Sequence, residues 1–146
     1  MQRFVSILTI LTLSSLIAVP LTAQNGPAFV VIAHPDVPAE SISKKRVSQL
    51  LLREVSRWEG GLSAQPVDQE SHSAVRNSFS RQVHGRSVES IKNYWLRQIF
   101  SGNGEPPPEM ADDNAVIAFV KSHPGGIGYV TKRTRLSGVK VLDVAM

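Results

Sequence analysis

Strand-like and helix-like segments alternate along this sequence, and this alternation limits the possible folds more than any other feature. Residues Ala28–Ala33 form a continuous apolar run rich in β-branched side chains, which predicts a strand buried on both faces. A proline-rich turn follows, and Ser43 then caps a predicted crossover helix that continues through Glu54. After a pair of glycines, a second short strand is expected at 63–67. The first half of the chain is therefore predicted to run strand, helix, strand.

The second half of the chain carries three further helical patterns and two further strand patterns. One helical pattern, over 88–100, has a strongly apolar face that consists of Ile91, Tyr94, Trp95 and Ile99. Because strands and helices interleave throughout, we expect an α/β domain with helices flanking a mixed sheet. The predicted elements are a helix capped by Ser71 or Ser73 and ended by Gly85, a helix opened by Ser87, a helix capped by Asp112 or Asp113, and strands at 127–131 and 139–144.

The first 23 residues have the order of a secretory signal. Arg3 precedes an apolar run from Phe4 to Val19, and small residues end the segment at Ala23. The run of roughly 16 residues is shorter than the ~20 that a membrane-crossing helix needs, which favours a signal peptide over an anchor. No Cys follows to carry a lipid. We therefore expect residues 1–23 to be a signal peptide, and the remainder to be periplasmic or secreted without stable membrane insertion.

The predicted mature segment, residues 24–146, has the size of one domain with a single core. The absence of Cys excludes thiol chemistry and Cys-ligated metal sites. Without Arg3 the segment has 15 basic and 12 acidic residues, a mild excess that favours small anions or an anionic surface. The basic residues are scattered with little aromatic interleaving, so no nucleic-acid partner is expected.

The sequence offers no arrangement typical of an enzyme or a metal site. No two histidines have the i, i+4 spacing that would present a pair of imidazoles to zinc. Ser71 and Ser73 lie outside any G-x-S-x-G motif, and helix capping explains Asp112-Asp113. We therefore predict a non-enzymatic protein without cofactor or metal, in which surface or capping roles account for the histidines at positions 34, 72, 84 and 123.

The segment from Asp68 to Arg76 is the best candidate for a binding site. It is a polar loop that leads from a strand end into a helix N-terminus, where free backbone N–H groups and the helix dipole attract anions. Gln69 and the hydroxyls of Ser71 and Ser73 would add donors, and Arg76 would supply a nearby positive charge. The alternative is that a serine is only the N-cap and that Arg76 is a solvated charge.

Four segments, taken in order, resemble the phosphate-type periplasmic solute-binding proteins of ABC transporters, the PstS-like family. Leu50–Trp58 is similar to the family's I-F-x-G-K-x-x-x-W segment, and Gln69–Phe79 lies where the family has R-x-x-G-S-G-T-x-x-x-F. Tyr94-Trp95 with Phe100-Ser101-Gly102 and the closing Pro124–Val130 resemble the family's final motifs, which include I-G-Y-V. The resemblance spans residues 30–130.

The resemblance implies a class II periplasmic-binding-protein fold, in which two α/β lobes close on an oxyanion. This chain looks like little more than one such lobe, which leaves a bound anion wet and without hinge closure. Gln69 stands where the family has its phosphate-binding Arg, and only Ser73 keeps a hydroxyl within the stretch that corresponds to Gly-Ser-Gly-Thr. At about 1.5–3 kcal/mol for each hydrogen bond to a charged group, these departures would cost several kcal/mol of phosphate affinity.

Two functions follow from the resemblance. The first is an exported solute-binding-protein-like domain that binds phosphate or a similar small oxyanion for ABC-type uptake, with an ABC permease or another envelope protein as partner. The second is a non-catalytic envelope interaction module that has lost its ligand and docks a protein near Trp58, Tyr94 or Trp95. The loss of the family's Arg favours the second function, whereas the anion-compatible loop favours the first.

Overall fold

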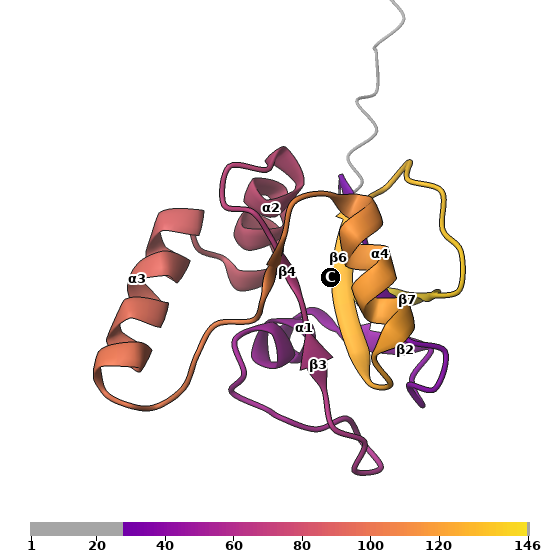
Figure 1. Cartoon of the computed structure of the whole chain (residues 1–146), viewed down its shortest axis with the longest axis horizontal. Coiled ribbons are helices and arrows are strands. Elements are labelled where there is room, and N and C mark those ends of the chain that lie inside the picture. Colours follow the sequence, from indigo (N-terminus) through magenta and orange to yellow (C-terminus); the bar gives the residue numbers. More distant parts are fainter. Residues whose placement is uncertain (1–27, 146) are drawn as a thin grey trace, which may run out of the picture.

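Two sheets organise residues 28–145, the part of the chain that the computed structural model describes (Figure 1). The predicted signal peptide lies outside these residues. The smaller sheet pairs β4 (Asp68–Gln69) with β5 (Glu109–Met110) in parallel. The larger sheet has the order β2-β7-β1-β6-β3, and its strands are β1 (Phe29–Ala33), β2 (Ser41–Ser43), β3 (Gln65–Pro66), β6 (Gly126–Thr131) and β7 (Lys140–Ala145).

The larger sheet is mixed, as the sequence predicts. Its central strand β1 runs antiparallel to both neighbours, with Val31 opposite Tyr129 of β6 on one side and Leu142 of β7 on the other. The two edge strands run parallel to their partners, β2 to β7 and β3 to β6. These directions make β2 and β3 parallel to each other at opposite edges of the sheet.

The helices begin at the residues that the sequence indicates. The side chain of each N-cap residue accepts a hydrogen bond from the backbone N–H three positions on, which satisfies a donor without an intrahelical partner. The N-caps are Ser43, Ser73, Ser87 and Asp112. They open α1 (Lys44–Leu51), α2 (Ala74–Phe79), α3 (Val88–Phe100) and α4 (Asp113–Ser122), and a π-helical segment η1 (Ser80–His84) continues α2 to the left-handed Gly85.

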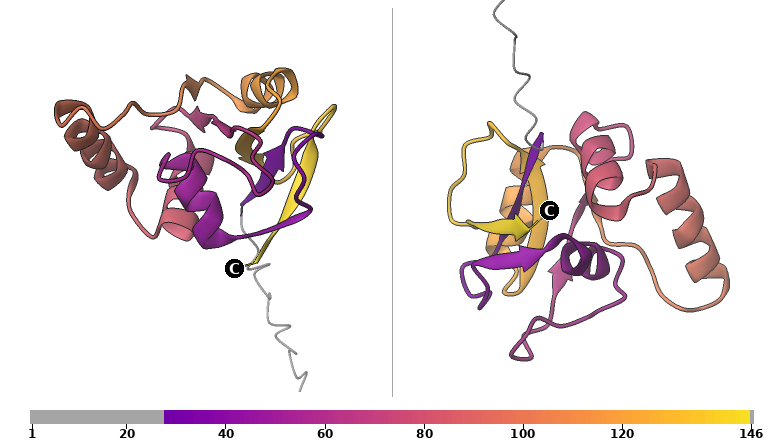
Figure 2. Two further views of the ribbon diagram at one scale, coloured as in Figure 1. Left: turned by 90° about the horizontal axis from the view of Figure 1, so that it is seen from below. Right: turned by 180° about the vertical axis from the view of Figure 1, so that it is seen from behind.

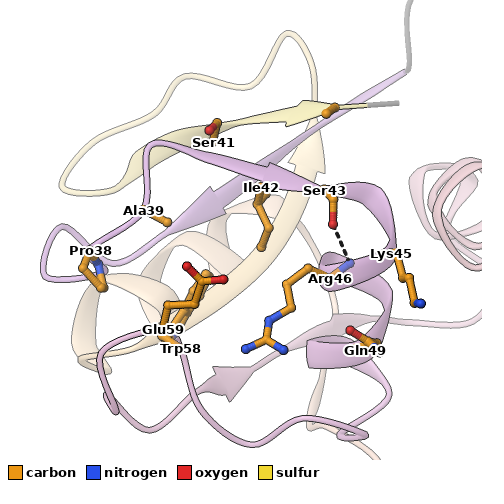
Figure 3. A pocket seen from close by; sticks show the side chains of 11 residues that line it. Pro38, Ala39, Ser41, Ile42, Ser43, Lys45, Arg46, Gln49, Trp58 and Glu59 are labelled. Carbon is orange, nitrogen blue, oxygen red and sulfur yellow. Dashed lines mark hydrogen bonds between the residues drawn. The ribbon is translucent and has the colours of Figure 1, made fainter.

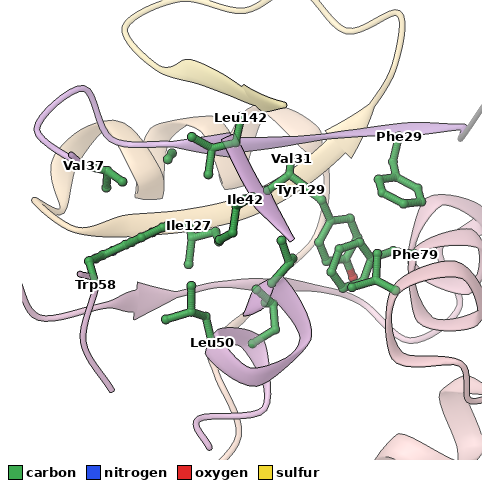
Figure 4. Close-up of a cluster of buried hydrophobic side chains, with 14 of the residues drawn as sticks. Phe29, Val31, Val37, Ile42, Leu50, Trp58, Phe79, Ile127, Tyr129 and Leu142 are labelled. Carbon is green, nitrogen blue, oxygen red and sulfur yellow. The ribbon is translucent and has the colours of Figure 1, made fainter. Parts of the chain in front are cut away.

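Helices cover both faces of the larger sheet (Figure 2). Side chains of β1 alternate between two cores, because successive residues of a strand point to opposite faces. Phe29, Val31 and Ala33 join the larger core beneath α1, α2 and η1, which Figure 4 shows around Tyr129 and Phe79. Ile32 joins the smaller core, where α4 packs on the other face. The prediction that both faces of this strand are buried is confirmed.

The first helix departs from prediction in its end and in the strands that it connects. The helix α1 ends at Leu51, and Arg53 takes the left-handed φ of 54°, so Glu54 is not helical. Leu52 then turns into a third small cluster with Ile91 and Trp95 of α3. The helix α1 connects the edge strand β2 to β3, whereas the sequence predicted a connection from the first strand, β1. The sequence did not indicate β2 or β5, because strands of two or three residues have no measurable periodicity.

The helix α3 lies at one end of the molecule, away from the larger sheet (Figure 1). Its inner face buries Ile91 and Trp95, and the Tyr94 hydroxyl donates to the Leu52 carbonyl at 3.3 Å. Ile99, the fourth residue of the apolar face, is not buried with them, since 49% of its surface is exposed. None of the helices within residues 28–145 is long and apolar enough to cross a membrane.

The helix α4 packs closely on the larger sheet at Gly128. A Cβ atom added there would lie 2.8 Å from Val67 Cγ1 and 2.9 Å from Val116 Cγ1. We expect Gly128→Ala to lower the free energy of unfolding by about 1–3 kcal/mol, since overpacking forces neighbours to shift. Urea denaturation measures this loss. In the double variant Gly128→Ala/Val116→Ala the shortened valine makes room, so the combined cost should be smaller than the sum of the single costs; strict additivity would contradict this packing.

Candidate functional site

The predicted binding segment, residues 68–76, is not all loop, because Asp68–Gln69 form β4 and residues 74–76 belong to α2. The structure brings three of its four predicted site residues into one contact network. Gln69 and Arg76 are 2% and 3% exposed, and Ser73 lies between them at the start of α2. Ser71 lies on the connecting turn outside this network and lines a surface depression. The segment therefore has a buried side, whose polar groups bond within the chain, and an open side that faces solvent.

Ser73 is both the N-cap of α2 and a partner of Gln69. Its Oγ accepts from the Arg76 backbone N–H at 3.3 Å and donates to Gln69 Oε1 at 3.2 Å. The amide nitrogen of Gln69 donates to Asp113 Oδ1 at 2.6 Å and to the Tyr129 carbonyl at 3.1 Å. Gln69 thus ties the starts of α2 and α4 to β6, and its amide is fully engaged within the chain.

Arg76 is a buried ion-pair partner, so the alternative that it is a solvated charge is wrong. Its Nη1 lies 3.0 Å from Asp68 Oδ1 and 3.4 Å from Glu109 Oε1, and it also donates to the Gln69 carbonyl. The Tyr129 hydroxyl donates to the same Asp68 carboxylate. Two carboxylates of the chain therefore take the positive charge that the sequence assigned to an anionic ligand.

The carboxylates around this network respond differently to their surroundings. Burial raises the pKa of Asp68, although Arg76 and the Tyr129 hydroxyl act in the opposite direction. Burial also raises the pKa of Tyr129, and the neighbouring Asp68 carboxylate adds to the effect. For Asp113 burial would raise the pKa, but hydrogen bonds from Thr134, Gln69 and Thr131 outweigh it and lower the pKa. The lowered pKa favours the carboxylate form of Asp113, whereas the raised pKa of Asp68 reflects the cost of burying the charge that Arg76 balances.

The open side of the segment forms a depression of about 390 Å³ between the starts of α2 and α3. Hydroxyls of Ser71 and Ser73 line it together with the side chains of Arg81 and Lys92. Arg81 is held in place by a hydrogen bond from its Nε to Asn77 Oδ1 at 3.0 Å. One carboxylate, Glu89, also lines the depression. Hydroxyls and two cations facing a shallow hollow are suited to a small anion in contact with water.

Sequence reasoning missed Arg81 and Lys92 as site residues. Arg81 lies one turn beyond Asn77 on the helical segment that Ser73 opens, a spacing that places both on one face. Lys92 comes from α3, and only the packing of α3 against η1 brings it to the depression. Helical spacing from Ser73 could therefore have indicated Arg81, whereas nothing in the sequence connects Lys92 to this segment.

His84 is not the surface or capping residue that the sequence suggests. Its half-buried imidazole lies edge-on to Phe79 with ring centroids 5.2 Å apart, and its Nδ1 is 2.8 Å from Ser48 Oγ. Burial lowers the pKa of His84 to about 4, and the charges of Arg76 and Arg86 add to this effect. The residue is therefore a neutral part of the contact between α1 and η1. Residues 28–145 contain no group of three or more His, Cys, Asp or Glu side chains placed to hold a metal ion.

Solved structures with a similar backbone are phosphate-transport receptors. A protein described as a phosphate ABC transporter substrate-binding protein, with bound phosphate, from Clostridium perfringens matches at a TM-score of 0.61 and 16% identity over 80% of this chain and 44% of its own. A phosphate transport receptor from Vibrio cholerae matches at 0.63 and 11% identity, over 80% of this chain and 46% of its own. The fold is that of phosphate-type solute-binding proteins.

The third comparison agrees in fold and in extent. PstS from Borrelia burgdorferi matches at a TM-score of 0.54 and 20% identity over 80% of this chain and 47% of its own. The chain thus spans less than half the length of each of these structures, as expected for a short, single-lobe form. No family model and no curated protein sequence matches the chain.

We expect the Asp68–Arg76 pair to be strongly coupled. Asp68→Asn should lower the free energy of unfolding by about 3–5 kcal/mol, because it leaves the buried Arg76 charge without its closest partner. The double variant Asp68→Asn/Arg76→Met should cost less than the sum of the two single changes. Urea denaturation gives all four values of the cycle. Glu40→Gln, which breaks the exposed pair between Glu40 and Lys140, is the control and should cost at most about 1 kcal/mol.

His84 predicts a loss of stability in acid. Because its folded pKa of about 4 lies below the ordinary 6.5, its contribution is complete above pH 6.5 and is lost as the pH falls towards 4. The variant His84→Gln does not titrate there, so its stability relative to the natural chain should rise by up to about 3 kcal/mol between pH 7 and pH 4. Denaturation midpoints at pH 7, 5.5 and 4 measure this. The natural chain measured in parallel is the reference, and identical pH profiles for it and for His84→Gln would contradict the assignment.

Proposed function

We propose that this chain is an exported solute-binding domain that binds phosphate or a similar small oxyanion for ABC-type uptake in the periplasm. The observation that carries the proposal is the depression at the start of α2, where hydroxyls and two cations meet in the fold of phosphate-transport receptors. Signal-peptide export and delivery to an ABC permease belong to the same proposal.

The oxyanion would be held by groups on the open side of the predicted segment. The first turn of α2 leaves the backbone N–H groups of Ala74 and Val75 without intrahelical partners. Ser71 and Ser73 add hydroxyls, and Arg81 and Lys92 add positive charge. Gln69 and Arg76 would not contact the oxyanion but would position the residues that do. Gln69 accepts a hydrogen bond from the Ser73 hydroxyl, and Arg76 donates to the backbone carbonyl of Gln69.

Binding of this kind should be weaker than that of a closed two-lobed receptor. The depression leaves an anion in contact with water, where each charge interaction is reduced by the high dielectric constant. Glu89 opposes the two cations, and the Ser73 hydrogen must turn away from Gln69 before it can donate to a ligand. We therefore expect an affinity that depends strongly on ionic strength.

A second function, an envelope interaction module, is favoured by the outer face of α3. Leu96, Ile99 and Phe100 lie at helical spacing on this face and are 51%, 49% and 87% exposed. Of the three aromatic residues that the sequence suggested for docking, Trp58 and Trp95 do not serve, because they are 4% and 7% exposed within the cores, and Tyr94 is half-buried on α3. A docking surface would therefore be formed by the outer face of α3.

Calorimetric titration of the purified chain with phosphate and with sulfate at low salt tests the first function. We expect saturable binding that weakens at least about tenfold in Arg81→Gln/Lys92→Gln, since each lost charge-assisted hydrogen bond is worth about 1.5–3 kcal/mol. Ser73→Ala should weaken binding and also remove the cap of α2. Asp112→Ala, which removes the equivalent cap from α4, controls for the loss of stability alone.

The two functions give different outcomes in this experiment. Heat on phosphate addition that Ser73→Ala and Arg81→Gln/Lys92→Gln reduce, and Asp112→Ala does not, supports the uptake function. Absence of heat up to millimolar anion would reject it and leave the interaction module as the better account of the chain.

A further inference from the structure

A second hollow, of about 600 Å³, shares no lining residue with the depression at α2. It lies between the edge strand β2, the first turns of α1 and the loop that carries Trp58 and Glu59 (Figure 3). Its volume falls within the range of roughly 300–1,000 Å³ that small-ligand sites occupy. The proposed oxyanion site makes no use of it.

The apolar wall of this hollow is rigid. Ile42 of β2 is 8% exposed and points into the hollow, and Pro38 and Ala39 extend the same surface (Figure 3). The indole of Trp58 is fixed by a hydrogen bond from its Nε1 to the Gly125 carbonyl at 2.9 Å. A ligand side chain placed here would therefore meet a preformed apolar surface, and little conformational entropy would be lost on binding.

The charged walls of the hollow have opposite signs. Arg46 reaches in from α1, with Lys45 beside it, and Glu59 enters from the loop after Trp58 (Figure 3). Arg46 Nη2 donates to the Arg57 carbonyl at 3.1 Å, which anchors the guanidinium at this wall. The ion pairs within residues 28–145 include none of these three side chains, so the two signs face the hollow without neutralising each other.

We propose that this hollow binds a short peptide with free termini. Its carboxylate would meet Arg46 and Lys45, its ammonium group would meet Glu59, and an apolar side chain would lie on Pro38 and Ala39 beside the edge of Ile42. The volume exceeds that of a single amino acid. Within residues 28–145, β2 pairs only with β7, so the outer backbone edge of β2 is available to an extended chain. A simple oxyanion would match neither Glu59 nor the apolar wall.

Titration of the full chain with the tripeptide alanyl-leucyl-alanine tests this proposal. The free tripeptide should bind, and its N-acetylated and C-amidated forms should each bind at least about tenfold more weakly, because each loses one charge-assisted contact. Absence of binding by the free tripeptide up to millimolar concentration, or equal binding of all three forms, would overturn the proposal.

Variants of the charged residues test which wall of the hollow binds each terminus of the peptide. Arg46→Gln should weaken the N-acetylated form at least about tenfold and leave the amidated form unchanged, whereas Glu59→Gln should do the reverse. Lys45→Gln repeats the first test at an exposed side chain whose loss should not disturb folding, and thermal unfolding of each variant confirms a folded chain. Arg97→Gln and Glu105→Gln, exposed changes of the same kind away from the hollow, are matched controls.

The proposal requires that each variant weaken the binding of one modified peptide and leave the binding of the other unchanged. If Arg46→Gln, Lys45→Gln and Glu59→Gln bind all three peptides as the controls do, the peptide lies elsewhere and the assignment is overturned. Because the two hollows share no residue, peptide binding and phosphate binding succeed or fail independently, so failure here would not be confused with failure of the proposed oxyanion site.

Discussion

The buried contact between Arg76 and Asp68 is the interaction on which the arrangement of the other elements depends. It joins α2 to β4, and the Tyr129 hydroxyl brings β6 to the same carboxylate. Taking both charges out of water is costly, and only close geometry with additional hydrogen bonds compensates for it. The neighbouring Gln69 adds hydrogen bonds of this kind. Its side-chain amide bonds to Ser73 at the start of α2 and to Asp113 at the start of α4, which holds the two helix starts together. The small sheet is thus the centre of a polar network between two apolar cores.

This network also decides which groups remain for recognition. The side-chain amide of Gln69 is occupied by hydrogen bonds to Ser73 and to the Tyr129 carbonyl. The charge of Arg76 is balanced by Asp68. Neither residue is therefore available to a ligand. What remains free is at the surface, on Ser71, Arg81 and Lys92, where solvent reduces electrostatic attraction. The chain spans less than half the length of the matched receptors, and its remaining polar groups lie in open surface hollows, where we propose that ligands bind.

Both hollows follow from features that the fold leaves incomplete. The depression at α2 lies where α3 stands away from the larger sheet and packs against η1. The second hollow exists because β2 is a short edge strand with no partner beyond it. In each case charged side chains of helical segments line the hollow, Arg81 and Lys92 in the first and Lys45 and Arg46 in the second, and both proposed binding sites therefore lie at the edges of the domain.

The sequence by itself determined the order of the helices and of the longer strands, the helix starts and the alternation of β1 between two cores, because N-caps and apolar periodicity act over a few residues. It also indicated Ser73 and its neighbourhood as the start of a helix with binding potential. Only the tertiary structure decided that Arg76 is neutralised by Asp68 and Glu109, that Lys92 faces Ser71, and that Trp58 and Trp95 are buried. These outcomes depend on contacts between residues far apart in the chain, and no local pattern of charge or hydrophobicity encodes which distant partner a side chain will meet.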